Sequence, residues 1–214
     1  MQPHLGQPVV AAGLPLDRAG AALVMVHGRN AGPQNILDLV PRLARPAFAC
    51  LAPAAAGRTW YPHSFLAPRE DNEPGVSSGL VVLERLLGEL AAHGLPPERV
   101  VLLGFSQGAC LTSQFAAEHP ARYGGVVLFS GGLVGPLGAI RQYPGSFHGT
   151  PVFLGCSDVD THVPMERVRE TAEVFTRMEA AVTVRIYPGM GHTVNEDEIA
   201  AAQEILDQVL PPDE

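Results

Sequence analysis

The sequence predicts an α/β protein, with a mostly parallel central sheet and helices on both of its faces. Apolar runs of strand length alternate along the chain with longer segments whose apolar residues recur at helical spacing. The runs show little polar alternation, as expected of strands that are buried on both faces. Of the 214 residues, 46% are hydrophobic and 17% are charged, so we expect a single domain over residues 1–214 with a substantial core.

The first part of the chain supplies three strands and two helices. Strands are expected over residues 9–12, 21–26 and 47–51, and helices over residues 33–43 and 76–93. The first strand is short and suits the edge of the sheet, whereas 21–26 is a continuous apolar run. Pro33 suits a first helical position. The 76–93 segment carries leucines on one helical face and ends at Gly94, so this helix should cover one side of the sheet.

The second part of the chain continues the alternation with four strands and three helices. The strands are expected over residues 100–103, 123–129, 151–155 and 182–187, and the helices over residues 107–118, 165–180 and 195–210. Pro120 stops the first of these helices, and Asn195 with Glu198 three residues later forms a capping box for the last. Residues 53–75 and 133–150 lack periodicity and are expected to be loops.

A glycine-rich turn joins the strand at 100–103 to the helix at 107–118. It reads Gly104-Phe105-Ser106-Gln107-Gly108, a G-x-S-x-G pattern that chance alone places in roughly one glycine-rich sequence in ten. Between a buried strand and a helix the pattern is much rarer, because the two glycines leave room for a turn tight enough to expose the serine hydroxyl. Free N–H groups at the helix start favour developing negative charge there, so Ser106 is a candidate nucleophile.

Four of the predicted strands end in loops that hold residues suited to acyl transfer. These residues are His27-Gly28-Arg29, Ser106, Asp158 or Asp160, and His192. The carboxyl ends of parallel strands meet at one edge of a sheet, so the four loops should converge there. An imidazole can remove the serine proton near neutral pH, and a carboxylate can orient the imidazole. The chain order Ser, Asp, His is typical of α/β-hydrolases, and we expect His27 to hold its own loop rather than act as a base.

Composition excludes several other classes of function. The formal charge of −8 and the scattered arginines argue against nucleic acid or an anionic membrane as partner. Cys50, Cys110 and Cys156 lie in or beside apolar stretches, which is typical of free thiols in a reducing compartment. The first residues also lack the basic segment and apolar run of a signal peptide, so we expect a cytoplasmic protein. His63 and His162 have no partner at a metal-binding spacing, and no phosphate or dinucleotide loop is present, so neither metal nor cofactor is expected.

Taken together, these motifs resemble those of the phospholipase/carboxylesterase family of α/β-hydrolases, over about residues 20–210. The resemblance rests on the Ser106 pentapeptide, His27-Gly28, the aspartate loop leading to Val163-Pro164, and Gly189-Met190-Gly191-His192. It implies an α/β-hydrolase fold. It also implies a catalytic triad and two backbone N–H donors for an oxyanion hole: the triad would be Ser106, Asp158 and His192, and the donors Arg29 and Gln107.

The aspartate loop departs from the family pattern, which commonly reads G-x-x-D-P-x-V-P. Here the loop runs from Gly155 to Val163-Pro164 and is two residues longer. Counting forward from Gly155 selects Asp158, whereas counting back from Val163-Pro164 selects Asp160. We expect Asp158 to be the triad acid, because the end of the strand determines where the carboxylate emerges.

The loop at 53–75 holds the only tryptophan of the chain. Trp60, Tyr61 and Phe65 are candidates for a pocket wall, the alternative being a surface loop whose aromatic residues cover the core. With no room for a large lid domain, an open pocket is expected, which predicts hydrolysis of short to medium acyl or aryl esters through an acyl-enzyme on Ser106. Thioester, lysophospholipid or dienelactone hydrolysis and non-catalytic ligand binding are the alternatives. A homodimer is a hypothesis that rests on the resemblance alone.

Overall fold

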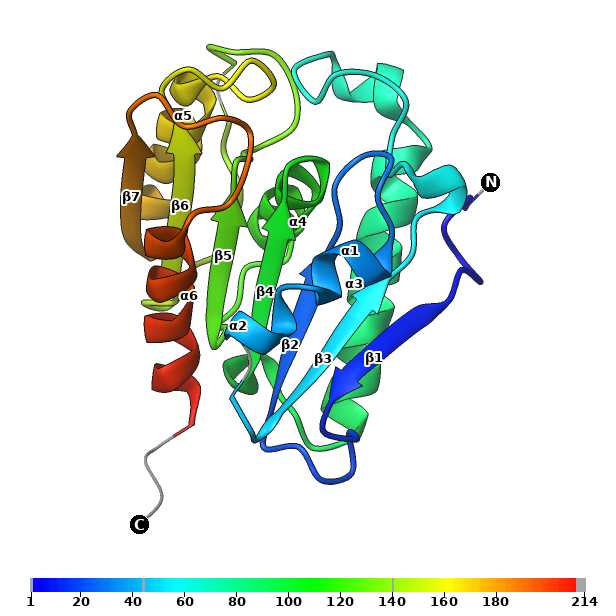
Figure 1. Cartoon of the computed structure of the whole chain (residues 1–214). Coiled ribbons are helices and arrows are strands. Elements are labelled where there is room, and N and C mark those ends of the chain that lie inside the picture. The colour runs from blue at the N-terminus through cyan, green and yellow to red at the C-terminus, as the bar shows by residue number, and fades with distance from the viewer. Residues whose placement is uncertain (1, 44, 140, 211–214) are drawn as a thin grey trace.

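One seven-stranded sheet forms the centre of the molecule (Figure 1). The computed structural model describes residues 2–43, 45–139 and 141–210. Along the sheet the strand order is β1-β3-β2-β4-β5-β6-β7, with β1 antiparallel to β3 and every other neighbouring pair parallel. The strands are β1 (Val9–Gly13), β2 (Ala21–Val26), β3 (Phe48–Pro53), β4 (Val100–Phe105), β5 (Gly125–Phe129), β6 (Pro151–Ser157) and β7 (Ala181–Tyr187).

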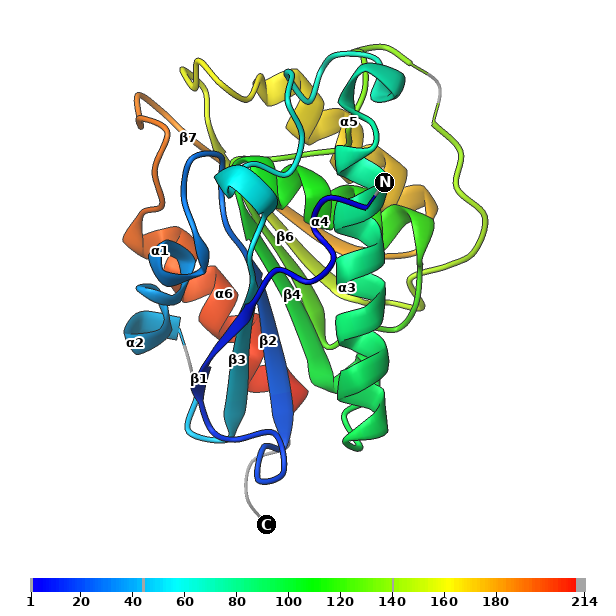
Figure 2. The same ribbon diagram turned by 90° about the vertical axis from the view of Figure 1, so that its right-hand side faces the viewer.

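Helices cover both faces of this sheet, as Figure 2 shows. They are α1 (Pro33–Leu37), α2 (Val40–Leu43), α3 (Gly75–Ala92), α4 (Gln107–Glu118), α5 (Met165–Arg177) and α6 (Glu196–Val209). Helices α3, α4 and α5 pack on one face, and α1, α2 and α6 on the other. Alternate residues of β2 enter the two separate cores, which explains why this strand is apolar at every position. The predicted fold class is confirmed.

Most elements begin or end within three residues of their expected bounds, and two of the differences have a clear physical cause. The helix expected over residues 33–43 is broken into α1 and α2, because Pro41 has no N–H to continue the α1 ladder and its ring crowds the preceding turn. Strand β6 continues two residues beyond Gly155, since Cys156 and Ser157 pair with Ile186 and Tyr187 of β7. This second difference moves the start of the aspartate loop.

The loop at 53–75 is less irregular than expected. It contains two short 3₁₀ helices, Ala56–Arg58 and Arg69–Asn72. None of the helices in the described parts of the chain combines the length and the apolar character that spanning a membrane requires.

Candidate active site

The turn between β4 and α4 holds Ser106 in a conformation that few residues adopt. Its φ is 56° and its ψ is −122°, outside the favoured regions for a residue with a side chain. A Cβ on Gly104 would lie 2.6 Å from the backbone of Ala109, and a Cβ on Gly108 would lie 2.1 Å from the carbonyl oxygen of Val26. Both glycines are therefore required for α4 to start so close to β2 and β4, and this tight turn projects the hydroxyl of Ser106.

A chain of hydrogen bonds links Ser106 to a carboxylate. His192 Nε2 lies 2.8 Å from Ser106 Oγ, and His192 Nδ1 lies 2.7 Å from Asp160 Oδ2. The side chain of Asp160 has no exposed surface, and its other oxygen accepts hydrogen bonds from the backbone N–H groups of His162 and Val163. Burial by itself would raise the pKa of Asp160, but these three hydrogen bonds to the charged form outweigh it and lower the pKa below its ordinary value. Asp160 is therefore an ionised partner for His192.

Asp158 does not contact His192, so the expectation that it would be the partner of the histidine is wrong. Asp158 Oδ1 instead accepts a hydrogen bond of 2.8 Å from the backbone N–H of Gly189. The reason is the length of β6. Because this strand ends at Ser157 rather than Gly155, the third residue after the strand is Asp160. Counting from the true strand end selects the residue that bonds to His192.

The loop after β2 and the start of α4 each place one of the two backbone amides that are expected to bind an oxyanion. Arg29 and Gln107 both line the pocket that holds Ser106 and His192. Within residues 2–43, 45–139 and 141–210, neither amide donates a hydrogen bond to a protein acceptor. Both N–H groups are thus free to bind an oxygen of a ligand.

His27 holds this loop, as expected, from a buried position. Its Nδ1 donates to the carbonyl oxygen of Gly28 at 2.8 Å, and its Nε2 accepts from the backbone N–H of Ala55 at 3.1 Å. Burial lowers the pKa of His27, and the nearby charge of Arg58 lowers it further, against the hydrogen bond to Gly28. The ring is neutral near pH 7, in the tautomer that these two hydrogen bonds require.

The pocket around Ser106, called here the serine pocket, has a volume of about 620 Å³. Tyr61 and Phe65 line it, together with His162, whose ring centroid lies 4.8 Å from that of His192. Trp60 does not line this pocket, so the prediction that Trp60 forms part of the pocket wall is wrong. The indole is fully buried between the rings of His4 and His27, and its Nε1 donates to the carbonyl oxygen of His27 at 2.9 Å.

Two supporting side chains were not anticipated from the sequence. The amide of Gln107 accepts from the backbone N–H of Trp60 and donates to the carbonyl oxygen of Tyr61, so it ties the Ser106 turn to the pocket wall. The buried His4 bonds to the carbonyl oxygen of Trp60 and the backbone N–H of Ala56. Both contacts join segments far apart in the sequence, and no local pattern signals them.

This arrangement can carry out nucleophilic chemistry at a carbonyl carbon. A hydroxyl, an imidazole and a carboxylate are hydrogen-bonded in sequence at the start of a helix, at the carboxyl edge of a parallel sheet. No group of three or more His, Cys, Asp or Glu residues in the described parts of the chain is arranged to hold a metal ion. The fold and the site together define an α/β-hydrolase.

Comparison with known proteins assigns the family. The profile of the Phospholipase/Carboxylesterase family matches residues 45–210, and the chain belongs to this family. A crystal structure of a phospholipase/carboxylesterase from Dyadobacter fermentans superimposes with a TM-score of 0.92 at 40% sequence identity, over 96% of this chain and 99% of the other. The Bacillus cereus carboxylesterase has the same fold, with a TM-score of 0.73 at 18% identity over 98% and 97% of the two chains.

Among curated sequences, acyl-protein thioesterase 1 of Gibberella zeae is 29% identical over 153 residues. That match covers 67% of this chain and 62% of the fungal protein. The chain thus spans less than two thirds of the length of this relative.

Proposed function

We propose that the protein cleaves carboxylic esters through an acyl-enzyme on Ser106. The single observation that carries the proposal is the unbroken run of hydrogen bonds from Ser106 Oγ through His192 to the buried Asp160. A serine hydroxyl is a weak nucleophile until a base removes its proton, and this run supplies the base together with the group that orients it.

In the first half of the proposed reaction, His192 Nε2 takes the proton of Ser106 as Oγ attacks the ester carbonyl carbon. The negative charge of the tetrahedral intermediate falls on the former carbonyl oxygen. The backbone N–H groups of Arg29 and Gln107 can donate to it, each contributing about 3 kcal/mol to lowering the barrier. His192 then gives its proton to the departing alcohol oxygen, which leaves an acyl group on Ser106.

In the second half, water repeats the attack. His192 removes a proton from the water molecule as the water oxygen bonds to the acyl carbon. His192 then returns a proton to Ser106 Oγ when the carboxylic acid leaves. Asp160 stays ionised throughout, because its buried carboxylate keeps the hydrogen bonds from the His162 and Val163 amides in every step. Its part is to hold the Nδ1–H tautomer and to stabilise the imidazolium.

The proposed substrates are short to medium acyl or aryl esters. A serine pocket of about 620 Å³ lined by Tyr61 and Phe65 suits small apolar groups. Steady-state comparison of short-chain and long-chain aryl esters checks this range, and a clear preference for long chains would contradict it. Thioester hydrolysis is the second candidate, because the similar protein of Gibberella zeae is named an acyl-protein thioesterase and the same groups serve both reactions.

Labelling with a fluorophosphonate probe tests the reaction. We expect a stoichiometric adduct that peptide mapping places on Ser106 and that is lost in His192→Ala. Turnover of a short-chain p-nitrophenyl ester should be lost in both Ser106→Ala and His192→Ala. Folded protein that neither labels nor turns over would instead support a non-catalytic ligand-binding protein.

We also propose a cytoplasmic homodimer. Cys50, Cys110 and Cys156 are free and buried, which suits a reducing compartment. The dimer rests on the family alone. Light scattering tests the proposed dimer, and a monomer at tens of micromolar would contradict it.

A further inference from the structure

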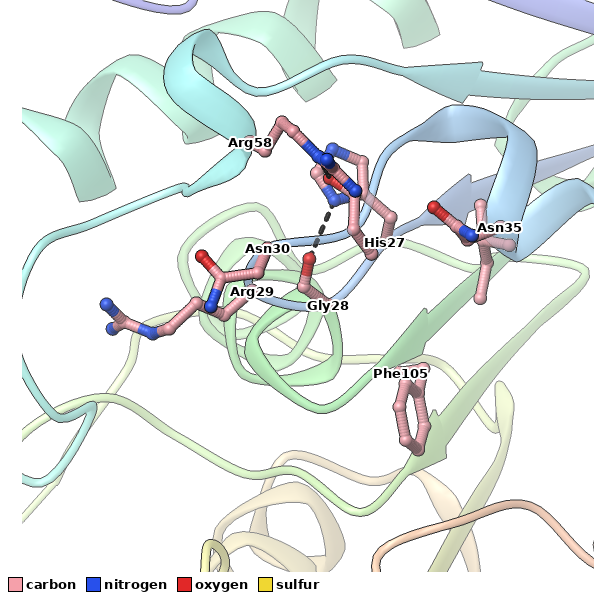
Figure 3. Close-up of a pocket in the computed structure, with 9 residues that line it drawn as sticks. His27, Gly28, Arg29, Asn30, Asn35, Arg58 and Phe105 are labelled. Atoms are coloured by element: carbon pink, nitrogen blue, oxygen red, sulfur yellow. Dashed lines mark hydrogen bonds between the residues drawn. The ribbon is translucent and has the colours of Figure 1, made fainter.

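A second pocket lies beside the serine pocket, on the other side of the β2 loop. It has a volume of about 290 Å³ and is called here the arginine pocket, after Arg58. Asn30 of the β2 loop and Asn35 of α1 line it, and Figure 3 shows Phe105 on the side opposite Arg58. The proposed reaction does not use the polar side chains of this pocket, which are those of Asn30, Asn35 and Arg58.

The two pockets are neighbours that share part of their lining. Gly28, Arg29, Asn30, Ala31 and Phe105 line both of them. A substrate bound at Ser106 therefore has to extend only past these shared residues to reach the arginine pocket.

The arginine pocket carries an uncompensated positive charge. Arg58 forms no ion pair among the described residues. Its Nε donates a long hydrogen bond of 3.4 Å to the carbonyl oxygen of Ala31, which leaves both Nη groups without a protein acceptor in the described parts of the chain. Arg29 differs, because its two Nη groups donate to the carbonyl oxygens of Pro62 and His63. No Asp or Glu among the described residues lines either pocket, although the chain as a whole is acidic.

The backbone holds Arg58 in place at some conformational cost. Arg58 has a φ of 60°, as does Asn30, and the carbonyl oxygen of Arg58 accepts a 2.8 Å hydrogen bond from the N–H of Asn30. Asparagine tolerates this left-handed conformation, whereas an arginine rarely adopts it. Strained residues cluster at ligand sites, and this one carries the free guanidinium.

The position of Phe105 decides which part of a substrate reaches Arg58. In the proposed reaction His192 must protonate the departing alcohol oxygen, so the alcohol portion lies next to His192. The ring of Phe105 lies 5.0 Å from that of His192 and also lines the arginine pocket. The alcohol portion of the ester therefore points toward this pocket.

We infer that the arginine pocket binds a carboxylate on the alcohol portion of the ester, with Arg58 as the residue that selects it. The two Nη groups suit a bidentate pair with one planar carboxylate, and the Asn35 amide N–H₂ is a further donor because its Oδ1 already accepts from the Gly32 N–H. The inference rests on the proposed function and adds a substrate class to it: esters whose leaving group is an anion.

Two esters of equal shape test the inference, namely meta-carboxyphenyl butyrate and meta-carbamoylphenyl butyrate. They present the same acyl group and differ in the charge of the leaving group. We expect kcat/KM to be about tenfold higher for the carboxyl ester, the lower end of the effect of a charged hydrogen-bonded pair at a partly exposed site. The preference should shrink as ionic strength rises.

Two variants of Arg58, with one of Arg85 as the control, assign the preference to Arg58. Arg58→Gln should remove most of it, Arg58→Lys should keep part of it because the charge remains, and Arg85→Gln, on the exposed face of α3, should keep all of it. Should Arg58→Gln fail to fold, Arg58→Lys and the salt dependence of the wild type carry the test. An equal rate for the two esters, or a preference unchanged in Arg58→Gln, overturns this inference alone. Failure to hydrolyse either ester overturns the proposed function and this inference with it.

Discussion

The turn that carries Ser106 and the loop that carries Asp160 hold their side chains by different means. The turn is held by close contact, since Gly104 and Gly108 lie against backbone where no Cβ fits. The loop is held by hydrogen bonds, since Asp160 accepts from two amides of its own loop and Asp158 accepts from Gly189 of the neighbouring loop. The turn should therefore be sensitive to added volume, and the loop to loss of a charge or an acceptor.

The largest expected effect is on catalysis, and it separates the two aspartates of the loop. Asp160→Asn keeps the shape of the side chain but lets an amide donate toward His192, which favours the wrong tautomer, so kcat should fall about 10⁴-fold. Asp158→Asn is the matched control and should lower kcat less than about tenfold. Turnover of a p-nitrophenyl ester by the two variants measures this. Equal losses would show that the hydrogen bonds of the structure do not distinguish the two residues.

The second effect is on stability and belongs to the Ser106 turn. Gly108→Ala places a Cβ 2.1 Å from the carbonyl oxygen of Val26, so we expect the free energy of unfolding to fall by more than about 4 kcal/mol. Gly88→Ala is the control, because a Cβ on this exposed helical glycine meets nothing and should stabilise by about 0.5–1 kcal/mol. Urea denaturation compares the variants. A folded Gly108→Ala of wild-type stability would contradict the steric account of the turn.

The third effect concerns the segment after His192, which is held by hydrogen bonds like the aspartate loop. Glu198 has no exposed surface and accepts from the backbone N–H of Asn195 at 2.9 Å, and burial raises its pKa from 4.5 to about 7. Between pH 4.5 and 7 the folded state holds a proton that the unfolded state releases. Glu198 therefore stabilises the fold below this window, and the advantage is lost as pH rises through it, by up to about 3 kcal/mol.

Glu198→Gln cannot titrate but keeps an acceptor for the Asn195 N–H. Its free energy of unfolding relative to wild type should therefore rise between pH 5 and pH 8. Urea denaturation at several pH values measures this difference. A constant difference between the two proteins would mean that Glu198 keeps an ordinary pKa.

The smallest effect isolates the hydrogen bond between Asp158 and Gly189. Both groups are exposed, so Asp158→Asn, whose amide oxygen remains an acceptor, should lower the free energy of unfolding by only about 0.5–1 kcal/mol. Thermal unfolding of the wild type, Asp158→Asn and Asp158→Ala measures this loss of stability, since only Asp158→Ala removes the acceptor. Equal losses in Asp158→Asn and Asp158→Ala would show that the charge, and not the acceptor, holds the loop.

Most of the fold could be predicted from the sequence because its signals are local. The order of strands and helices follows from apolar runs and helical spacing, and most elements end within three residues of their expected bounds. The differences with a clear cause are the break before Pro41 and the extension of β6 to Ser157. Ser106, His192 and the role of His27 in holding its loop were likewise predictable, since each depends on a short motif at a strand end.

The sequence by itself determined the layered α/β fold and the Ser106 turn, because a glycine that must lie against backbone is visible in the sequence as a glycine. Only the tertiary structure decided between Asp158 and Asp160, since β6 ends where its pairing with β7 ends, and that pairing joins residues 30 positions apart. It also decided that Trp60 is buried while Tyr61 and Phe65 line the serine pocket. Trp60 is held through its indole by His4 and His27 and through its backbone N–H by Gln107, and all three lie far from it in the chain and meet it only when the sheet is assembled.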